Sequence, residues 1–343
     1  MAFYDSLFNA FGLREWCDAS AGSAKMTMAS LLAKTNPDAA DEGPLFPFPS
    51  MDELYKACPS FPQSREFTAG VEEAFLNAKD VLKTVLDPLT QPLSWLLEGA
   101  LFIFLAAPWW IVVPLILLFV WYVCRSVAVT TFVTVSFAFL AFIDHLDAAL
   151  QTLAIIAVCT GICIILGVPV GIAMAKSNRF QRSLLPLLDL LQTLPTFVYL
   201  IPLIFLFSVT EPKLYGIAII VYAIVPVIRL TDLGIRLVDQ DVVEAANAFG
   251  MSSRQKLFGI ELPLALPNIM AGVNQTIMMS LAMVVIASLV SAPGLGVLVL
   301  RGIRNLELGV GLIAGLGIVL LAVILDRVSK AAIARVSTDQ TFK

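Results

Sequence analysis

A polar stretch of the chain holds residues whose types and spacing suit docking to another protein. Seven positions define it: Glu244, Ala245, Ala246, Gly250, Ile260, Leu262 and Pro263. The small side chains leave a low ridge that another surface can approach closely, and Glu244 sets one fixed charge beside that ridge. No cysteine or histidine cluster accompanies them, so the pattern indicates no metal chemistry. The set predicts contact with a partner and transmission of movement into the apolar segment that follows.

Two short helices are expected to carry these positions. The stretch that ends at Gly250 is rich in helix-forming residues with an apolar side, and Gly250 stands where a helix would stop. A second helix would follow, with Ser252 or Ser253 as its N-cap. Pro263 then restricts the return of the chain to the apolar segment. We therefore expect a cytoplasmic helix–turn–helix within a connection of residues 232–267.

Polar and aromatic side chains inside apolar segments form a second candidate set. Its members are Gln192, Thr193, Thr196, Phe197, Tyr199, Asn274 and Met278. Polar groups at membrane depth normally face the helix bundle or a cavity. Gln192, Thr196 and Tyr199 follow each other at spacings of four and three residues, hence on one helix face. The set could line a substrate path or hold helices together by hydrogen bonds. Asp189, nearer the cytoplasm, fits a snorkelling or capping role better than contact with the substrate.

The composition is that of an integral membrane protein. Of the 343 residues, 59% are hydrophobic and 14% are charged, whereas soluble domains have about 25% charged residues. About 20 apolar residues cross a bilayer. Seven segments are adequate or slightly short: 109–124, 126–142, 149–175, 184–208, 213–231, 268–290 and 306–326. The predicted fold class is an all-α polytopic membrane helical bundle. Residues 93–107 are expected to be interfacial, and the number of spans becomes eight if they cross.

The distribution of Lys and Arg predicts the orientation of the bundle. Basic residues follow alternate segments, at Arg125, at 176–182, at 229–256 and at 327–335. Short cytoplasmic loops carry an excess of these residues. We therefore expect a periplasmic amino terminus and a cytoplasmic carboxyl terminus. Arg301 and Arg304 lie in a connection expected on the outer side, so they are mild exceptions to this excess of basic residues in cytoplasmic loops.

Residues 1–92 form a polar extracytoplasmic tail in this scheme, and residues 93–343 form the transmembrane domain. The first 98 residues hold 14 acidic and 7 basic side chains, which agrees with an outer position. An amphipathic helix is expected at about 65–86, ended by Asp87-Pro88. Cys17 and Cys58 could pair if the tail faces an oxidising compartment, and the sequence does not decide between pairing and free thiols.

The seven docking positions resemble the EAA loop of permease subunits of ATP-binding-cassette importers. That signature reads E-A-A, three residues, G, nine residues, I, one residue and L-P, and every fixed position is met here. Three other stretches are similar to the glycine betaine/proline betaine permeases: "TLAIIAVCTGICIILGVPVGIAMAKS", "LLPLLDLLQTLPTFVYLIPLIFLF" and "VSAPGLGVLVLRGI". The resemblance covers roughly residues 140–330.

The resemblance implies a translocation subunit that is not itself an enzyme. In that family the EAA loop forms coupling helices that sit in a groove of a separate ATPase. The chain has no G-x-x-x-x-G-K-[ST] sequence, so ATP and Mg would be bound by that partner. The implied assembly has two copies of this permease, two ATPase subunits and an extracytoplasmic substrate-binding protein, in the bacterial inner membrane. Nothing in the charge suggests nucleic acid.

The implied substrates are glycine betaine, proline betaine, choline or trimethylamine N-oxide. A quaternary ammonium ion favours aromatic faces, which Phe197 and Tyr199 could supply. The alternative from a different class is an ion-coupled secondary transporter of a small solute. Such a carrier usually needs a buried carboxylate on its path, and the third and sixth segments contain none. A non-transporting scaffold, with the tail as a platform for partners, is a third reading.

Overall fold

The computed structural model describes residues 2–13, 17, 58 and 64–341, and the regular elements within them are all helical. The chain divides into two units, Met1–Asp80 and Val81–Lys343. The first unit contains α1 (Ala2–Ala10) and a disulfide between Cys17 and Cys58, against which Phe8 packs. The structure thus has the cysteine pairing that the sequence did not decide.

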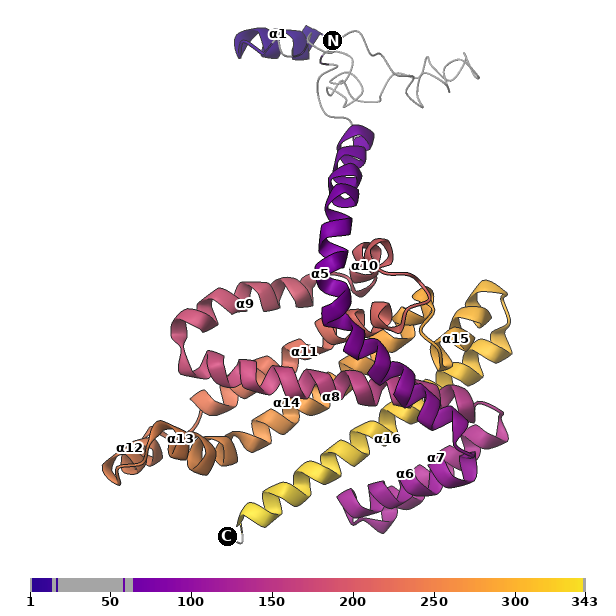
Figure 1. Ribbon diagram of the computed structural model, residues 1–343, viewed down its shortest axis with the longest axis vertical. Helices are drawn as coiled ribbons and strands as arrows, with labels where there is room; N and C mark the ends of the chain where they lie inside the picture. Colours follow the sequence, from indigo (N-terminus) through magenta and orange to yellow (C-terminus); the bar gives the residue numbers. More distant parts are fainter. Residues whose placement is uncertain (1, 14–16, 18–57, 59–63, 342–343) are drawn as a thin grey trace. The chain divides into compact units, whose positions relative to one another are not determined.

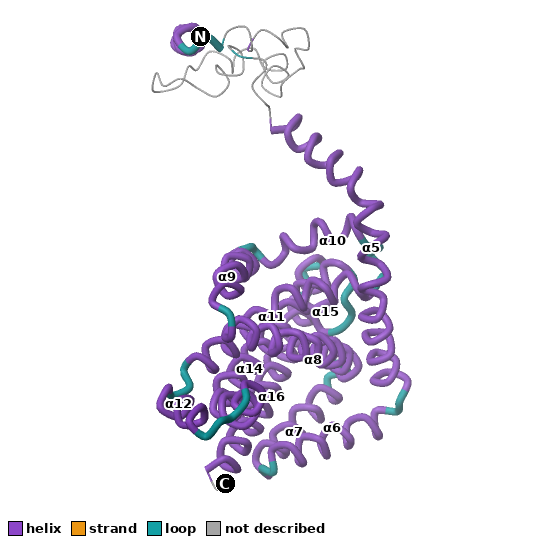
Figure 2. The backbone as a smooth tube through the Cα atoms, turned by 60° about the vertical axis from the view of Figure 1, so that its left-hand side comes forward, coloured by secondary structure: helices purple, strands orange, loops and turns teal. Residues whose placement is uncertain are grey.

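The second unit holds the helices of the membrane domain (Figures 1 and 2). A long helix, α5 (Ser64–Ala106), begins in the first unit and continues into the second. The others are α6 (Trp109–Cys124), α7 (Val127–Phe142), α8 (Leu146–Lys176), α9 (Asn178–Thr193), α10 (Leu200–Leu206), α11 (Pro212–Arg236), α12 (Gln240–Ala248), α13 (Ser253–Lys256), α14 (Leu262–Ala287), α15 (Leu295–Arg304) and α16 (Leu308–Thr341).

Five described helices are long and apolar enough to cross a membrane. They are Phe67–Ala106, Leu146–Lys176, Pro212–Arg236, Ser253–Val290 and Leu308–Arg335. The shorter apolar helices α6 and α7 agree closely with the first two predicted segments. The predicted segment 184–208 is not one continuous helix, because α9 and Thr196–Leu206 meet at an angle of 107°. The break falls at Leu194, whose backbone is extended because it precedes Pro195.

The predicted end of the amphipathic helix at Asp87-Pro88 is also wrong. α5 continues through Pro88 and Pro92 to Ala106. A proline inside a helix costs about 3 kcal/mol. Contacts within the second unit stabilise the helix at this point. Asp87 pairs with Lys213 at the start of α11 (2.7 Å), and Leu93 and Leu97 pack over Gly216.

Three helices, α8, α11 and α14, pack together at the centre of the second unit. Glycines permit their close approach. A Cβ atom added to Gly171 of α8 would lie 2.6 Å from Thr231 Cβ and 2.7 Å from Ile228 O of α11. A Cβ atom added to Gly234 of α11 would lie 2.8 Å from Asn268 Cβ of α14. Small residues at such interfaces are typical of membrane helices, and here they hold α11 between its two neighbours.

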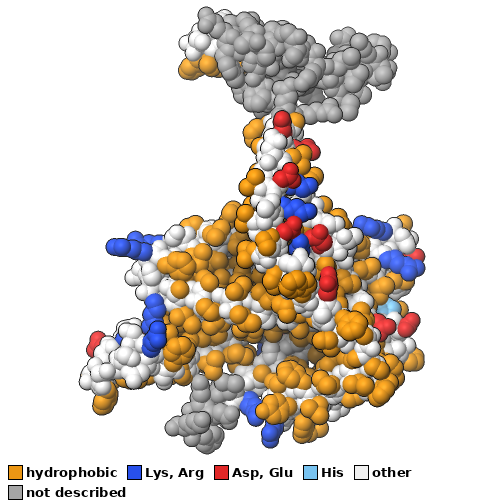
Figure 3. All heavy atoms as spheres, in the orientation of Figure 1, with side chains coloured by type: hydrophobic (Ala, Val, Ile, Leu, Met, Phe, Trp, Pro, Cys, Tyr) orange, Lys and Arg blue, Asp and Glu red, His pale blue; other side chains and the backbone are white. Residues whose placement is uncertain are grey.

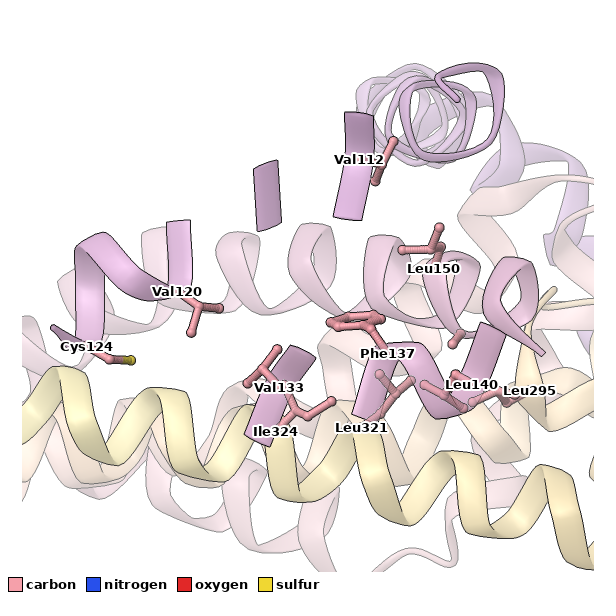
Figure 4. Close-up of a cluster of buried hydrophobic side chains, with 11 residues drawn as sticks. Val112, Val120, Cys124, Val133, Phe137, Leu140, Leu150, Leu295, Leu321 and Ile324 are labelled. Atoms are coloured by element: carbon pink, nitrogen blue, oxygen red, sulfur yellow. The ribbon is translucent and has the colours of Figure 1, made fainter. Parts of the chain in front are cut away.

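A cluster of buried apolar side chains holds α6 and α7 against α16 (Figure 4). Its members are Val112, Val120, Cys124, Val133, Phe137, Leu140, Ala149, Leu150, Leu295, Leu321 and Ile324. In Figure 4, Phe137 of α7 lies between Leu150 of α8 and Leu321 of α16. The α6–α7 pair therefore packs as part of the bundle.

Hydrogen bonds group several helix ends on the side of the unit that carries α12 and α13, here called the hairpin side. Arg335 of α16 donates to Tyr122 O near the end of α6 (2.7 Å). Arg236 at the end of α11 donates to Asn178 Oδ1 at the start of α9 (2.8 Å). These are the ends that the distribution of Lys and Arg assigns to one side of the membrane.

The other ends meet near α15, here called the α15 side. Leu295 N donates to Thr152 Oγ1 near the start of α8 (3.0 Å), and Ser291 Oγ donates to Val209 O just before α11 (2.8 Å). Figure 3 shows hydrophobic side chains over the middle of the visible face of this unit, with Lys and Arg gathered near its margins. The predicted alternation of segments agrees with both groups of contacts.

The C-terminal half of α5 lies along the α15 side. Asp87 pairs with Lys213 there, at the start of α11. At the far end of α5, Ala107 leads into α6, whose own far end reaches the hairpin side. In Figures 1 and 2 this half of α5 runs across the direction of α8. These contacts favour the interfacial position expected for 93–107, although the length and composition of α5 would let it cross a membrane.

Candidate functional site

α12 carries the first three docking positions and ends in a turn that contains the fourth, Gly250. Asp239 caps the start of the helix by accepting a backbone N–H two residues on (3.0 Å). At the end, Gly250 N donates to Asn247 O (3.0 Å) and Met251 N donates to Ala246 O (3.1 Å), the two bonds of a Schellman motif. Gly250 has a φ of +73°, and a Cβ there would have nothing within 4 Å. Backbone conformation, not crowding, therefore favours glycine.

The second limb of the hairpin runs without a break into the next membrane helix. Ser252 and Gln255 form a capping box at the start of α13. A π-helical turn, Leu257–Glu261, then joins α13 to α14, and Ser253–Val290 is one apolar helix. The predicted second helix with a serine cap is confirmed, but it does not end before the membrane helix, because Pro263 lies in the first turn of α14, a position where proline is tolerated.

The exposed surface of the hairpin contains only part of the predicted set. The exposed positions are Glu244, Ala245 and Gly250. Ala246 is 3% exposed, so the low ridge predicted to include it is wrong at that residue. Lys256 Nζ donates to Asn247 Oδ1 (2.9 Å) and ties the two limbs together. A partner can thus reach the exposed positions while the hairpin stays folded.

The last three docking positions lie on the helix that follows the hairpin. Ile260, Leu262 and Pro263 are all half-buried there. The structure therefore does not bring all seven positions to one exposed surface. It places one group at the end of α12 and another at the start of the membrane helix.

The predicted docking positions did not include a bulky apolar residue beside the glycine turn. Phe249 is 88% exposed, and Val242, two turns earlier on α12, is exposed as well. Large exposed apolar side chains that share a patch mark contact sites. The available signal was the spacing of seven residues between the two, which places them on one face of a helix.

A polar network also missed by sequence reasoning joins the hairpin to the membrane helices. Glu261, in the π-helical turn, is 5% exposed and pairs with Lys176 at the end of α8. Arg236 of α11 donates to Asp232 Oδ1 (2.8 Å) and to Met174 O of α8 (2.7 Å). The spacing of Asp232 and Arg236 by four residues was the signal for this pair. A displaced hairpin would therefore act on α8 as well as on α14.

The polar set of segment 184–208 lies around the break between α9 and α10. Gln192 and Thr193 are exposed at the end of α9, and Thr196 begins a short 3-10 turn, Thr196–Tyr199. The 107° bend separates Gln192 from Tyr199. The predicted common helix face is therefore wrong, because the helix that would create it does not exist.

Tyr199 supports the bend, and Phe197 is the more accessible ring. The Tyr199 hydroxyl donates to Leu191 O, and its ring centroid lies 6.3 Å from that of Tyr222 on α11. Tyr199 is 8% exposed, whereas Phe197 is 57% exposed. The aromatic face that could meet a solute is therefore that of Phe197.

Asn274 is directed toward α16. Ser329 Oγ donates to Asn274 Oδ1 (2.5 Å), and Asn274 Nδ2 donates to Asp326 Oδ1 (3.4 Å). Met278, one turn later on α14, is half-buried. Of the two roles left open for Asn274, the structure supports the interhelical hydrogen bond.

Asp189 does not cap a helix. Its carboxylate pairs with Arg229 of α11, so the predicted capping role is wrong. The pair joins α9, the first part of the broken segment, to the central helix α11.

Comparison with known proteins places this architecture in a family. Residues 167–338 match the family model described as "Binding-protein-dependent transport system inner membrane component". The chain is similar to the glycine betaine/proline betaine transport system permease protein ProW of Escherichia coli, with 37% identity over 92% of this chain and 88% of ProW. The glycine betaine transport system permease protein OpuAB of Bacillus subtilis is 42% identical over 66% of this chain and 76% of its own length.

Two further likenesses are more partial. The trimethylamine N-oxide transport system permease protein TmoV of Ruegeria pomeroyi is 41% identical over 57% of this chain and 30% of its own length. An inward-facing structure of the MetNI methionine ABC transporter covers 56% of this chain and 95% of that chain, with a TM-score of 0.51 and 18% identity. The latter likeness is one of fold. The chain is a multi-pass inner-membrane protein and belongs to the family of inner membrane components of binding-protein-dependent transport systems.

Proposed function

We propose that this chain is the translocation subunit of an ATP-binding-cassette importer for glycine betaine or a related amine solute. Proline betaine, choline and trimethylamine N-oxide are the related solutes. The observation that carries the proposal is the glycine-ended hairpin built continuously onto α14. It occurs in a chain that matches ProW, named as a betaine permease, over most of both lengths.

In this proposal the hairpin docks into a separate ATPase chain. Glu244 and Ala245 offer a small, singly charged surface, and Phe249 offers an apolar anchor. The ATPase would bind ATP and Mg, so this subunit hydrolyses nothing itself. Its closure on ATP would pull the hairpin and, through α14 and Glu261, shift the central helices.

The hairpin side would face the cytoplasm and the α15 side the periplasm. The basic residues at the hairpin-side ends support this orientation, and the Cys17–Cys58 disulfide fits an amino terminus in an oxidising compartment. The carboxyl terminus would be cytoplasmic. Each chain has one hairpin, so two copies of this permease would serve two ATPase subunits, and an extracytoplasmic binding protein would deliver the solute.

Co-purification and uptake test the docking assignment. We expect Glu244→Lys to lose most of the bound ATPase chain, because reversing a charge at a docking surface opposes association. Asp147→Lys makes the same change on an exposed residue of the α15 side and is expected to leave the complex intact. If Glu244→Lys retains both the ATPase and uptake, the docking assignment fails.

Transport by the complete set of subunits in liposomes tests the solute. Uptake of glycine betaine should require ATP on the hairpin side and a loaded binding protein on the other. Uptake that follows a proton or sodium gradient and ignores ATP would instead support the ion-coupled carrier.

A further inference from the structure

The ion pair between Asp189 and Arg229 lies at membrane depth. Arg236 and Asn178 are hydrogen-bonded and mark one level on the hairpin side. Arg229 precedes Arg236 by two turns of α11, which places it about 10 Å from that level. The predicted apolar segment 213–231 includes Arg229, so the pair lies near the hairpin-side end of that segment.

The pair is also open to its surroundings. The Asp189 side chain is 62% exposed and that of Arg229 is 33% exposed. A charged group at this depth is costly against lipid and normally faces a water-filled cavity or another protein. The exposed side of the pair therefore faces either the translocation pathway or a second copy of the chain.

Neighbouring residues favour the pathway. Gln192 and Thr193 follow Asp189 by three and four residues on α9, so they share its face, and both are exposed. The accessible ring of Phe197 follows just after the bend. A surface that combines amide, hydroxyl, opposite charges and one aromatic ring suits a small polar solute.

Arg229 has capacity to bind more than Asp189. One of its terminal nitrogens, Nη2, donates to the carboxylate, and the guanidinium has five N–H donors in all. Its Nε is buried, so the exposed third of the side chain is the part that a solute can reach. A guanidinium presents a planar fork that matches a carboxylate. An incoming carboxylate could therefore accept from Arg229 while the Asp189 carboxylate stays close by.

We propose that Arg229 and Asp189 form a solute-contacting site in the pathway, with Arg229 holding the carboxylate of a zwitterion and Asp189 facing its quaternary ammonium group. This site rests on the proposed function and narrows its substrate class to small zwitterions. The ammonium group donates no hydrogen bonds and is held by charge. The solute thus meets both charges of the pair in one orientation.

The test measures glycine betaine uptake and ATP hydrolysis by the complete transporter in liposomes, with saturating loaded binding protein. We expect Arg229→Gln to lower uptake at least about tenfold, as loss of a hydrogen bond to a charged group does, while ATP hydrolysis continues. Arg229→Lys should retain more uptake than Arg229→Gln because it keeps the charge. Arg182→Gln, on the same helix as Asp189, removes an exposed guanidinium that bonds Asn178 O within its own helix and should leave uptake unchanged.

A double variant that exchanges the two charges distinguishes contact with the solute from an ion pair that only joins two helices. If Asp189→Arg combined with Arg229→Asp restores full uptake, the pair only joins α9 to α11 and the inference is overturned. Wild-type uptake by Arg229→Gln would overturn it as well. A wild-type transporter that moves no quaternary amine would refute the proposed function, whereas equal uptake by wild type and Arg229→Gln would refute only this inference.

Accessibility gives a second measurement that does not depend on how the charge variants fold. Gln192→Cys should react with a membrane-impermeant thiol reagent, and saturating glycine betaine should slow that reaction. The native thiols Cys124, Cys159 and Cys163 are buried, which limits background. Cross-linking between two copies through Gln192→Cys, without labelling in any nucleotide state, would assign the face to a contact between copies and overturn the inference.

Discussion

Substitution of Gly250 by alanine isolates the contribution of one backbone conformation to the stability of the hairpin. The residue has a φ of +73°, and an added Cβ would meet nothing within 4 Å. The change therefore costs only the left-handed conformation, about 1–2 kcal/mol. Alanine also reduces the freedom of the unfolded chain, which returns about 0.4–1 kcal/mol. The net cost is about 1 kcal/mol, or about fivefold in the opening equilibrium of the turn.

Amide hydrogen exchange measures that equilibrium directly. The amides of Phe249, Gly250 and Met251 donate to carbonyls of α12, and we expect their exchange to accelerate about fivefold in Gly250→Ala, in line with the net cost above. Gly259→Ala is the matched control: it lies in the π-helical turn without a positive φ, and its added Cβ would be 3.7 Å from Met251 Cε. It should slow exchange or leave it unchanged. Unaltered exchange in Gly250→Ala, or equal acceleration in both variants, would refute the reasoning.

Three further predictions concern the packing of the bundle and are checked by thermal unfolding in detergent. Gly171→Ala should destabilise the chain by about 1–3 kcal/mol because it overpacks α8 against α11, whereas Gly161→Ala on the same helix, with open space, should not. Asp87→Asn and Glu211→Gln should each lower the stability only slightly, because Lys213 keeps one paired carboxylate in either variant. The double variant should lose more stability than the sum of the two single losses, since it leaves the buried Lys213 cation unpaired. Asn274→Leu should cost about 1 kcal/mol by removing the hydrogen bonds to α16; no loss would argue against that network.

Local signals predicted the hairpin well. The positive φ of Gly250 and the serine cap of α13 follow from backbone preferences that act over a few residues, and the sequence displays them directly. The bounds of α6 and α7 were predicted for a similar reason, because each is a compact apolar run between polar or proline residues.

Tertiary contacts decided the features that the sequence did not predict. Asp87-Pro88 was predicted to end a helix, but packing on Gly216 and the pair with Lys213 stabilise α5 beyond it. Pro195, by contrast, does interrupt its segment, and nothing local distinguishes the two cases. Partners distant in sequence also explain the roles of Asn274 and Asp189, since spacing along one helix cannot show what faces it.

The π-helical turn between α13 and α14 sets the rotational phase of the hairpin relative to the membrane. Such a turn accommodates one residue more than an α-helical turn, and one residue corresponds to about 100° of rotation about the helix axis. Glu244 and Phe249 therefore point in a direction that depends on the residue count of Leu257–Glu261. Removing one residue there would leave both helices intact but would rotate the hairpin about the axis of α14. A partner that docks on the hairpin must thus match the angular setting of the hairpin as well as its side chains.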